Sequence, residues 1–254
     1  MTSSAFDAAF DFAGKVVLVT GGAAGIGHAM ATLFAERGAT LAVFDRDPAV
    51  MDAAHGLPGD GHLGVVVDVT GTAALEQAVA SVIAQFGRID VLVNNAGIVR
   101  LAPADTLTIE DWDLTMAVNL RAPFLVSQIV GRQMLSQGSG RIVNLASQAA
   151  IVGIEGHVAY CASKAAIVGM TKVLALEWGP RGITVNAISP TVVETELGKK
   201  AWAGEVGEAM KRQIPSRRFA QPQEIAFAAL YLASGAAGML NGENLVVDGG
   251  FTIQ

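Results

Sequence analysis

The sequence has only one cysteine, Cys161, in 254 residues, and this excludes a disulfide bond within the chain. Residues 1–12 lack both the basic start and the unbroken apolar core that are typical of a signal peptide. Because structural disulfides belong mainly to oxidising compartments, their absence here favours a reducing one. We therefore expect a cytoplasmic protein.

Long hydrophobic runs are also missing. Stretches such as residues 15–20 and 89–93 are far shorter than the roughly 20 residues that span a bilayer, so we expect no membrane segment. Clustered metal ligands are missing as well, because His28, His55 and His62 have no cysteine or carboxylate at ligand spacing. We expect no metal site.

Charge is scarce, at 16% of the residues, and the net charge is −6. The 17 lysines and arginines are scattered, which argues against nucleic acid as a partner because phosphate binding needs basic clusters. Hydrophobic residues make up 52% of the chain, as expected of a compact protein. So few charges leave little polar surface, and we expect a homo-oligomer in which identical subunits cover apolar faces.

Short β-branched runs alternate with helix-length segments along the whole chain. The runs occupy residues 15–20, 40–45, 63–69, 89–94, 140–147, 182–189 and 243–248. They are apolar on both faces, as strands are when helices cover both sides of a parallel sheet. We predict an α/β fold, a single doubly wound Rossmann-type domain with a seven-stranded parallel sheet at residues 14–254, after an N-terminal extension at residues 1–13.

Residues 190–215 are the one long irregular stretch, and they contain Trp202 with several glycines and glutamates. A long insertion of this kind is often a lid over a substrate site. An inert surface loop is the alternative interpretation.

The first predicted strand leads into the sequence TGGAAGIG at residues 20–27, and a helical pattern follows. Here Gly21 would allow a sharp turn, Gly25 a close approach to a pyrophosphate, and Gly27 tight packing of helix on strand. The helix N-terminus, with Ile26 in its first turn, would face the phosphates. We predict dinucleotide binding by these four residues, because the cluster lies between strand and helix; a glycine cluster elsewhere would be weak evidence.

Asp45 ends the second predicted strand, 18 residues beyond Gly27. A carboxylate there can accept hydrogen bonds from ribose hydroxyls and repels a 2′-phosphate, which favours NAD over NADP. The neighbouring Arg46 would soften that repulsion. Asp68, followed by Val69, ends the third predicted strand, where it is a candidate for contact with the adenine amino group; a solvated turn residue is the alternative.

Tyr160 and Lys164 are four residues apart on a predicted helix at residues 158–178, so both side chains project from one face. A tyrosine with a pKa near 10 is a poor base at neutral pH, and a neighbouring ammonium favours the phenolate. This pair is a candidate proton-transfer site.

Together the motifs have a recognisable order. They are TGxxxGxG at residues 20–27, NNAG at 94–97, Asn119, Ser147 and YxxxK at 160–164. This set resembles that of the short-chain dehydrogenases/reductases, and the resemblance extends from Gly14 to the VDGG at residues 247–250. The sequence is further similar to the NAD-dependent sugar-alcohol (polyol) dehydrogenases of that family.

The resemblance implies roles for individual residues. Tyr160 would be the acid/base, Lys164 would lower its pKa and hold the nicotinamide ribose, and Ser147 would bind the reacting oxygen. Asn119 would anchor a water in the proton path. Further cofactor contacts implied by the family are Asn95, Ala96, Gly97, Pro190, Val193 and Thr195.

One position departs from the family, because Thr191 follows Pro190 where glycine is usual. Its hydroxyl can point at nicotinamide or substrate. The substrate residues that we predict are Ser147, Gln148, His157, Tyr160 and Thr191. For His157 an ordinary surface group is the alternative, and for Gln148 a loop at the sheet edge.

These observations predict an oxidoreductase that transfers a hydride between NAD and the secondary hydroxyl or ketone of a small polyol. We expect a homotetramer. The alternatives within the family are a 3-oxoacyl-thioester reductase, which Asp45 and the negative net charge disfavour, and another secondary-alcohol or steroid dehydrogenase. A nucleotide-sensing binding protein without turnover is the non-enzymatic alternative.

Overall fold

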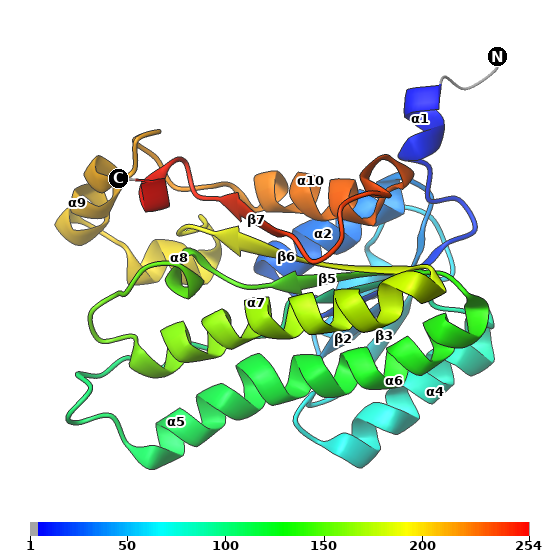
Figure 1. Ribbon diagram of the computed structural model, residues 1–254, viewed down its shortest axis with the longest axis horizontal. Helices are drawn as coiled ribbons and strands as arrows, with labels where there is room; N and C mark the ends of the chain where they lie inside the picture. The colour runs from blue at the N-terminus through cyan, green and yellow to red at the C-terminus, as the bar shows by residue number, and fades with distance from the viewer. Residues whose placement is uncertain (1–4, 254) are drawn as a thin grey trace.

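Seven parallel strands form one sheet in the computed structural model, which describes residues 5–253 (Figure 1). Their order is β3-β2-β1-β4-β5-β6-β7. The strands are β1 Val16–Thr20, β2 Thr40–Asp45, β3 Leu63–Val66, β4 Val91–Asn94, β5 Gly140–Leu145, β6 Ile183–Pro190 and β7 Asn244–Val247. The predicted seven-stranded parallel sheet of a Rossmann-type fold is confirmed.

Helices cover both faces of this sheet (Figure 1). The α-helices are α1 Ala5–Ala9, α2 Gly25–Glu36, α3 Val50–His55, α4 Thr72–Phe86, α5 Ile109–Met116, α6 Ala122–Gln137, α7 Val158–Trp178, α8 Glu196–Ala201, α9 Glu205–Gln213 and α10 Pro222–Ala233. Short helices are η1 Ala117–Arg121, η2 Gln148–Ala150, η3 Gly179–Arg181, η4 Gly235–Ala237 and η5 Phe251–Ile253; η1 is a π-helix and the others are 3-10 helices.

The strands bury both faces because their successive side chains point in opposite directions. Val17 and Val19 join a core cluster with α2 and α10. Val16 and Leu18, which alternate with them, join a second cluster with α4, α6 and α7. Apolar residues on both faces of β1 are therefore a direct consequence of its central place in the sheet.

Two predicted strands end too late. β3 stops at Val66 rather than at residue 69, and Asp68 lies in a turn where its Oδ1 accepts from the backbone N–H of Thr70 (2.9 Å). β5 stops at Leu145 rather than at residue 147, because Ser147 caps η2 by accepting from the N–H of Ala149 (3.2 Å). In both places a polar side chain makes a hydrogen bond to the nearby backbone, and this bond takes the place of the backbone hydrogen bonds between strands.

Residues 190–215 are more ordered than the sequence pattern suggested, since they contain α8 and α9. The hydroxyl of Thr195 caps α8 by accepting from the N–H of Gly198 (2.9 Å). Gly204, with φ +70°, separates the two helices. The interpretation of an irregular loop was therefore wrong.

The N-terminal stretch contributes to the core. Phe12 is 3% exposed, and its ring meets that of Phe34 edge-on at 5.0 Å. Residues 1–4 of the predicted extension, and residue 254, lie outside the described residues.

Two continuous helical segments, Ile109–Gln137 and Val158–Arg181, are long and apolar enough to span a membrane by length and composition alone. Both pack against the sheet, and α6 and α7 supply core residues such as Val130 and Leu174. Their apolar faces thus have a place inside the fold, as those of core helices do.

Candidate active site

The chemically informative segments meet at the carboxyl edge of the sheet, because all seven strands run in the same direction. The glycine-rich turn follows β1, Asp45 ends β2, and the NNAG segment begins at the end of β4. Ser147 follows β5 and Thr191 follows β6. The fold therefore brings together residues that lie far apart in the sequence.

The glycine-rich turn is held by the segment after β4. Gly21 has φ +66°, and a Cβ at this position would lie 2.9 Å from the Cα of Ala96, so only glycine fits. Asn95 donates through Nδ2 to the carbonyls of Thr20 (3.0 Å) and Gly21 (2.8 Å). In return, the Thr20 hydroxyl accepts from the backbone N–H groups of Asn95 and Ala96. Sequence reasoning missed Thr20, although a hydroxyl residue between strand and glycine turn was a usable signal.

The start of α2 fits the phosphates of a dinucleotide. A Cβ on Gly27 would lie 2.1 Å from the carbonyl oxygen of Gly21, so the helix crosses the turn at a distance that excludes any side chain. Gly25 has φ +59° and faces the methyl group of Thr195. Ala24 gives α2 no side-chain cap, which leaves its first amides to an anion.

Asp45 is held in place at the end of β2. Its Oδ2 accepts from the N–H of Ala23 (3.1 Å) and its Oδ1 from that of Asp47 (3.0 Å). The carboxylate is therefore fixed beside the glycine turn, where a ribose would lie. Asp68 is exposed, and the hydrogen bonds from Thr70 lower its pKa; the following Val69 is buried.

Tyr160 and Ser147 interact through their hydroxyl groups. Burial raises the pKa of the Tyr160 phenol, the hydrogen bond with Ser147 acts in the opposite direction, and the nearby Cys161 raises it further. The net direction is upward. Burial is the largest cause of this shift, and the lowering of this pKa by Lys164 stays a prediction.

Lys164 is 5% exposed and lies on α7 one turn after Tyr160. Its Nζ donates to the carbonyl of Leu145 at 2.6 Å and lies 5.7 Å from the centre of the Tyr160 ring. Burial lowers the pKa of Lys164 from 10.5 to about 8. A cation is thus held at the edge of the sheet, close to the phenol.

Asn119 occupies the π-helix between α5 and α6, and such bulges are frequent at functional sites. Its Oδ1 accepts from the N–H of Ile98 (2.8 Å), and its Nδ2 donates to the Ile98 carbonyl (2.9 Å) and the Ser163 hydroxyl (3.2 Å). The Ser163 hydroxyl in turn donates to the carbonyl of Tyr160 (2.8 Å). Asn119 therefore connects the NNAG segment to the catalytic helix; Ser163 was not predicted.

The comparisons with known proteins agree with this geometry. The family model described as enoyl-(acyl carrier protein) reductase matches residues 21–252. The chain is 56% identical to D-threitol dehydrogenase of Mycolicibacterium smegmatis over 250 residues, with 96% of each chain covered. It is 52% identical to the NAD-dependent glycerol dehydrogenase of Listeria innocua over 254 residues, with full coverage of both.

The chain belongs to the short-chain dehydrogenase/reductase family. Its fold agrees with that of a short-chain type dehydrogenase/reductase from Mycobacterium marinum, with a TM-score of 0.93 and 34% identity. This alignment covers 99% of the chain and 100% of the crystal structure. The predicted family and fold class are thus confirmed.

The segment after β6 runs from the sheet edge to the glycine turn in this short-chain dehydrogenase/reductase. Pro190 is the last residue of β6, and Thr191 is 7% exposed. Val193 pairs with Ala220 in an isolated bridge. Thr195 then reaches Gly25, so this short segment borders the whole edge that a dinucleotide would occupy.

The predicted substrate residues Gln148 and His157 differ in their burial. Gln148 is 4% exposed, and its Oε1 has no hydrogen-bond partner among the described residues. His157 is partly exposed, its Nδ1 lies 2.7 Å from the Glu155 carbonyl, and its ring lies 6.3 Å from that of Tyr160. Within residues 5–253, no group of three or more histidine, cysteine or acidic side chains could hold a metal ion.

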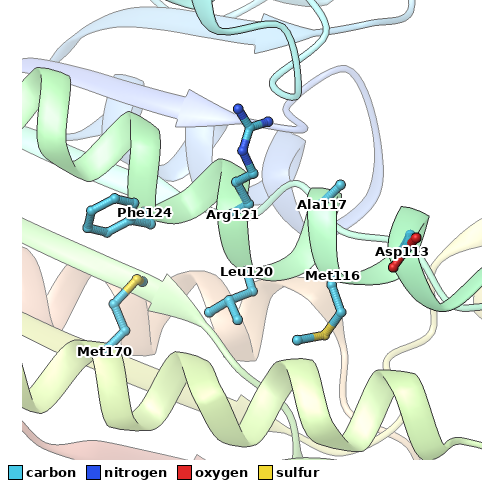
Figure 2. Close-up of a pocket in the computed structure, with 7 residues that line it drawn as sticks. All are labelled: Asp113, Met116, Ala117, Leu120, Arg121, Phe124 and Met170. Carbon is cyan, nitrogen blue, oxygen red and sulfur yellow. The ribbon is translucent and has the colours of Figure 1, made fainter.

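An apolar groove of about 510 Å³ lies on the outer side of the helical layer, away from the catalytic residues. Figure 2 shows Met116, Leu120 and Met170 pointing toward one another between the α5–α6 segment and α7, while the Arg121 guanidinium points away. The lining residues are Asp113, Met116, Ala117, Leu120, Arg121, Phe124 and Met170.

Proposed function

We propose that this protein is an NAD-dependent dehydrogenase that oxidises a secondary hydroxyl of a small polyol to the ketone, and that it also catalyses the reverse reduction. The observation that carries the proposal is the hydroxyl pair of Ser147 and Tyr160 beside the buried Lys164 ammonium. These groups lie at the sheet edge where the glycine turn and Asp45 fit a dinucleotide. The threitol and glycerol dehydrogenases among its relatives support a polyol substrate.

The chain's own residues would bind NAD along this edge. The amides of Gly25, Ile26 and Gly27 would hold the pyrophosphate, and Asp45 would accept from the adenosine ribose. The other proposed cofactor contacts are Gly21, Asp68, Val69, Asn95, Ala96, Gly97, Tyr160, Lys164, Pro190, Val193 and Thr195. When bound, NAD supplies the hydride acceptor and a positively charged ring.

Side chains of the protein would bind the substrate oxygen and transfer its proton. The Ser147 hydroxyl would hold the substrate oxygen, and the Tyr160 phenolate would accept its proton as the hydride leaves the carbon. Lys164 would stabilise that phenolate and bind the nicotinamide ribose. Asn119, whose side-chain amide bonds Ile98 and Ser163, would keep the π-helix placed so that a water beside Lys164 can carry the proton onward.

The cofactor preference is tested by Asp45→Ala, matched with Asp47→Ala. Removing Asp45 removes the repulsion of a 2′-phosphate, so kcat/KM should move toward NADP by about tenfold or more. Asp47 is exposed and its Oδ1 accepts from Ala49, so its loss should leave the preference unchanged. A wild-type enzyme that already prefers NADP would contradict the assignment.

The substrate class is tested with NAD and a panel of four- to six-carbon polyols, simple secondary alcohols, hydroxysteroids and 3-oxoacyl thioesters. We expect the highest kcat/KM on a polyol. A preference for the thioester or the steroid would favour one of the alternative dehydrogenases. Bound NAD without turnover of any alcohol would favour the nucleotide-sensing alternative.

Two separate apolar faces support the homotetramer that we propose. One is the groove beside α5, α6 and α7, where Phe124 is exposed (Figure 2). The other adjoins the edge strand β7 and α10, where Phe227, Met239 and Ile253 are exposed. Two self-complementary faces on one subunit generate a closed assembly of four copies with dihedral symmetry.

A further inference from the structure

Five buried side-chain atoms among residues 5–253 have no hydrogen-bond partner. They are His28 Nδ1, Asn94 Oδ1, Gln148 Oε1, Thr184 Oγ1 and Thr191 Oγ1. Three of these residues, Asn94, Gln148 and Thr191, lie at or just beyond the carboxyl ends of the consecutive strands β4, β5 and β6. Buried polar groups are normally paired, so a concentration of unpaired ones at the catalytic edge needs an explanation.

Gln148 and Thr191 lie on neighbouring segments of this edge. Gln148 follows Ser147 directly, and Thr191 is the first residue after β6. β5 and β6 are paired through Leu145 and Ile188, and neighbouring strands lie about 4.8 Å apart. Both side chains therefore belong to the part of the edge that contains the Ser147 and Tyr160 hydroxyls.

Their unpaired atoms have complementary chemistry. The Oε1 of Gln148 can only accept a hydrogen bond, whereas the Thr191 hydroxyl can also donate one. One alcohol group satisfies both at once, since it donates to Gln148 while it accepts from Thr191. A ketone, thioester or carboxylate has no hydrogen to donate to Gln148 and leaves that oxygen unpaired.

We propose that Gln148 and Thr191 bind the hydroxyl on the carbon next to the reacting one and thereby select vicinal diols. This inference rests on the proposed function, which places the reacting hydroxyl at Ser147 and Tyr160. Both unpaired atoms are closed to water in the protein alone. Neither atom therefore has water as an alternative partner, and a monoalcohol offers them none.

The test compares kcat/KM for butane-2,3-diol with that for butan-2-ol, which has the same carbon chain, in wild type, Gln148→Met and Thr191→Val. Each substitution nearly preserves the side-chain volume and removes the polar atom. We expect the diol-to-monoalcohol ratio to fall by about 10- to 100-fold. Thr191→Ser should keep the wild-type ratio, and the Kd for NAD should stay within a few-fold.

Thr184→Val is the matched control. Thr184 is also buried with an unpaired hydroxyl, but it lies near the opposite end of β6. The same change there should leave the ratio unaltered. If Thr191→Val does not fold, Gln148→Met at wild-type Tm decides the question.

The possible failures are distinguishable. A wild type that prefers the diol, with variants that retain the full preference, would overturn the role of Gln148 and Thr191 and leave the dehydrogenase proposal intact. A wild type that oxidises diol and monoalcohol equally well would overturn both this inference and the polyol assignment.

Discussion

At the residue scale, the Tyr160 phenol illustrates how burial and catalysis oppose each other. Its surroundings raise its pKa, although the proposed reaction needs its phenolate. The Ser147 hydrogen bond is the one contact that lowers it in the protein alone. The remaining stabilisation of the phenolate must therefore come from Lys164 and from the positive ring of the bound cofactor.

Tyr160→Phe removes the transferable proton, and among the proposed nucleotide contacts it changes only the one made by the Tyr160 hydroxyl. We expect kcat to fall by about 10²- to 10⁴-fold, with the Kd for NAD within a few-fold of wild type. Steady-state kinetics and NAD titration measure the two effects. Tyr231, the other tyrosine of the chain, lies partly exposed on α10, and Tyr231→Phe should retain full turnover. Comparable turnover of both variants would refute the role of Tyr160.

The buried ammonium of Lys164 should lower the free energy of unfolding, although the proposed reaction needs this residue. Its pKa is lowered to about 8, so between pH 8 and 10.5 the unfolded chain binds more protons than the folded protein. The free energy of unfolding of wild type therefore rises with pH through that window, and the burial penalty is largest below it. Lys164→Met should be more stable than wild type at pH 7 by roughly 1–3 kcal/mol, although inactive.

The measurement is urea unfolding of both proteins at several pH values. The stability advantage of Lys164→Met should shrink as the pH rises from 8 toward 10.5. Lys172→Met, at an exposed position of the same helix, should show no such trend. A variant less stable than wild type at every pH would contradict a buried, poorly solvated ammonium.

At the scale of elements, the segment after β4 acts as a brace for the glycine turn. Asn95→Ala deletes two hydrogen bonds to the carbonyls of Thr20 and Gly21. We expect NAD to bind about tenfold more weakly and unfolding to require about 1–2 kcal/mol less. NAD titration and chemical denaturation measure both.

Asn241→Ala is the matched control for that experiment. Asn241 also makes hydrogen bonds to two backbone groups, since it donates to the carbonyl of Ala175 and accepts from the N–H of Val185. These groups lie on α7 and β6, and β4 and β5 separate β6 from β1. It should lose similar stability and keep its NAD affinity. Equal weakening of NAD binding in both variants would mean that Asn95 acts only through overall stability.

The sequence predicted the strands well, because apolar runs and glycine turns are local signals, whereas the catalytic roles of the motifs stay predictions. It failed where the outcome depends on competition with side chains, as at Asp68 and Ser147, whose hydrogen bonds end β3 and β5 early. α8 and α9 escaped prediction because Gly198, Gly204 and Gly207 interrupt short polar segments.

For the candidate site, the sequence indicated which residues share a helix face better than it indicated their electrostatics. The i, i+4 spacing places Tyr160 and Lys164 on one helix face, but their burial depends on segments that are distant in the sequence. The direction of the Tyr160 pKa shift and the contact from Lys164 to the Leu145 carbonyl both follow from that packing. The π-helix at Asn119 has no signature in the motif pattern.

At the scale of the whole molecule, the two apolar faces predict separable interfaces. Phe124→Glu, beside the groove, and Phe227→Glu, on α10, should each place a charge in one proposed interface and convert the proposed tetramer to a dimer. Light scattering coupled to gel filtration measures the mass. The double variant should be a monomer. Tetramers of both single variants would contradict these faces as contacts.

The five-residue π-helix serves two sides of the molecule at once. Its Asn119 points inward to Ile98 and Ser163, while Ala117, Leu120 and Arg121 line the outward groove. A neighbour seated in that groove would therefore brace the turn that carries Asn119. Specific activity should then vary with enzyme concentration, and on dilution below the dissociation constant of the assembly it should decline before the protein unfolds.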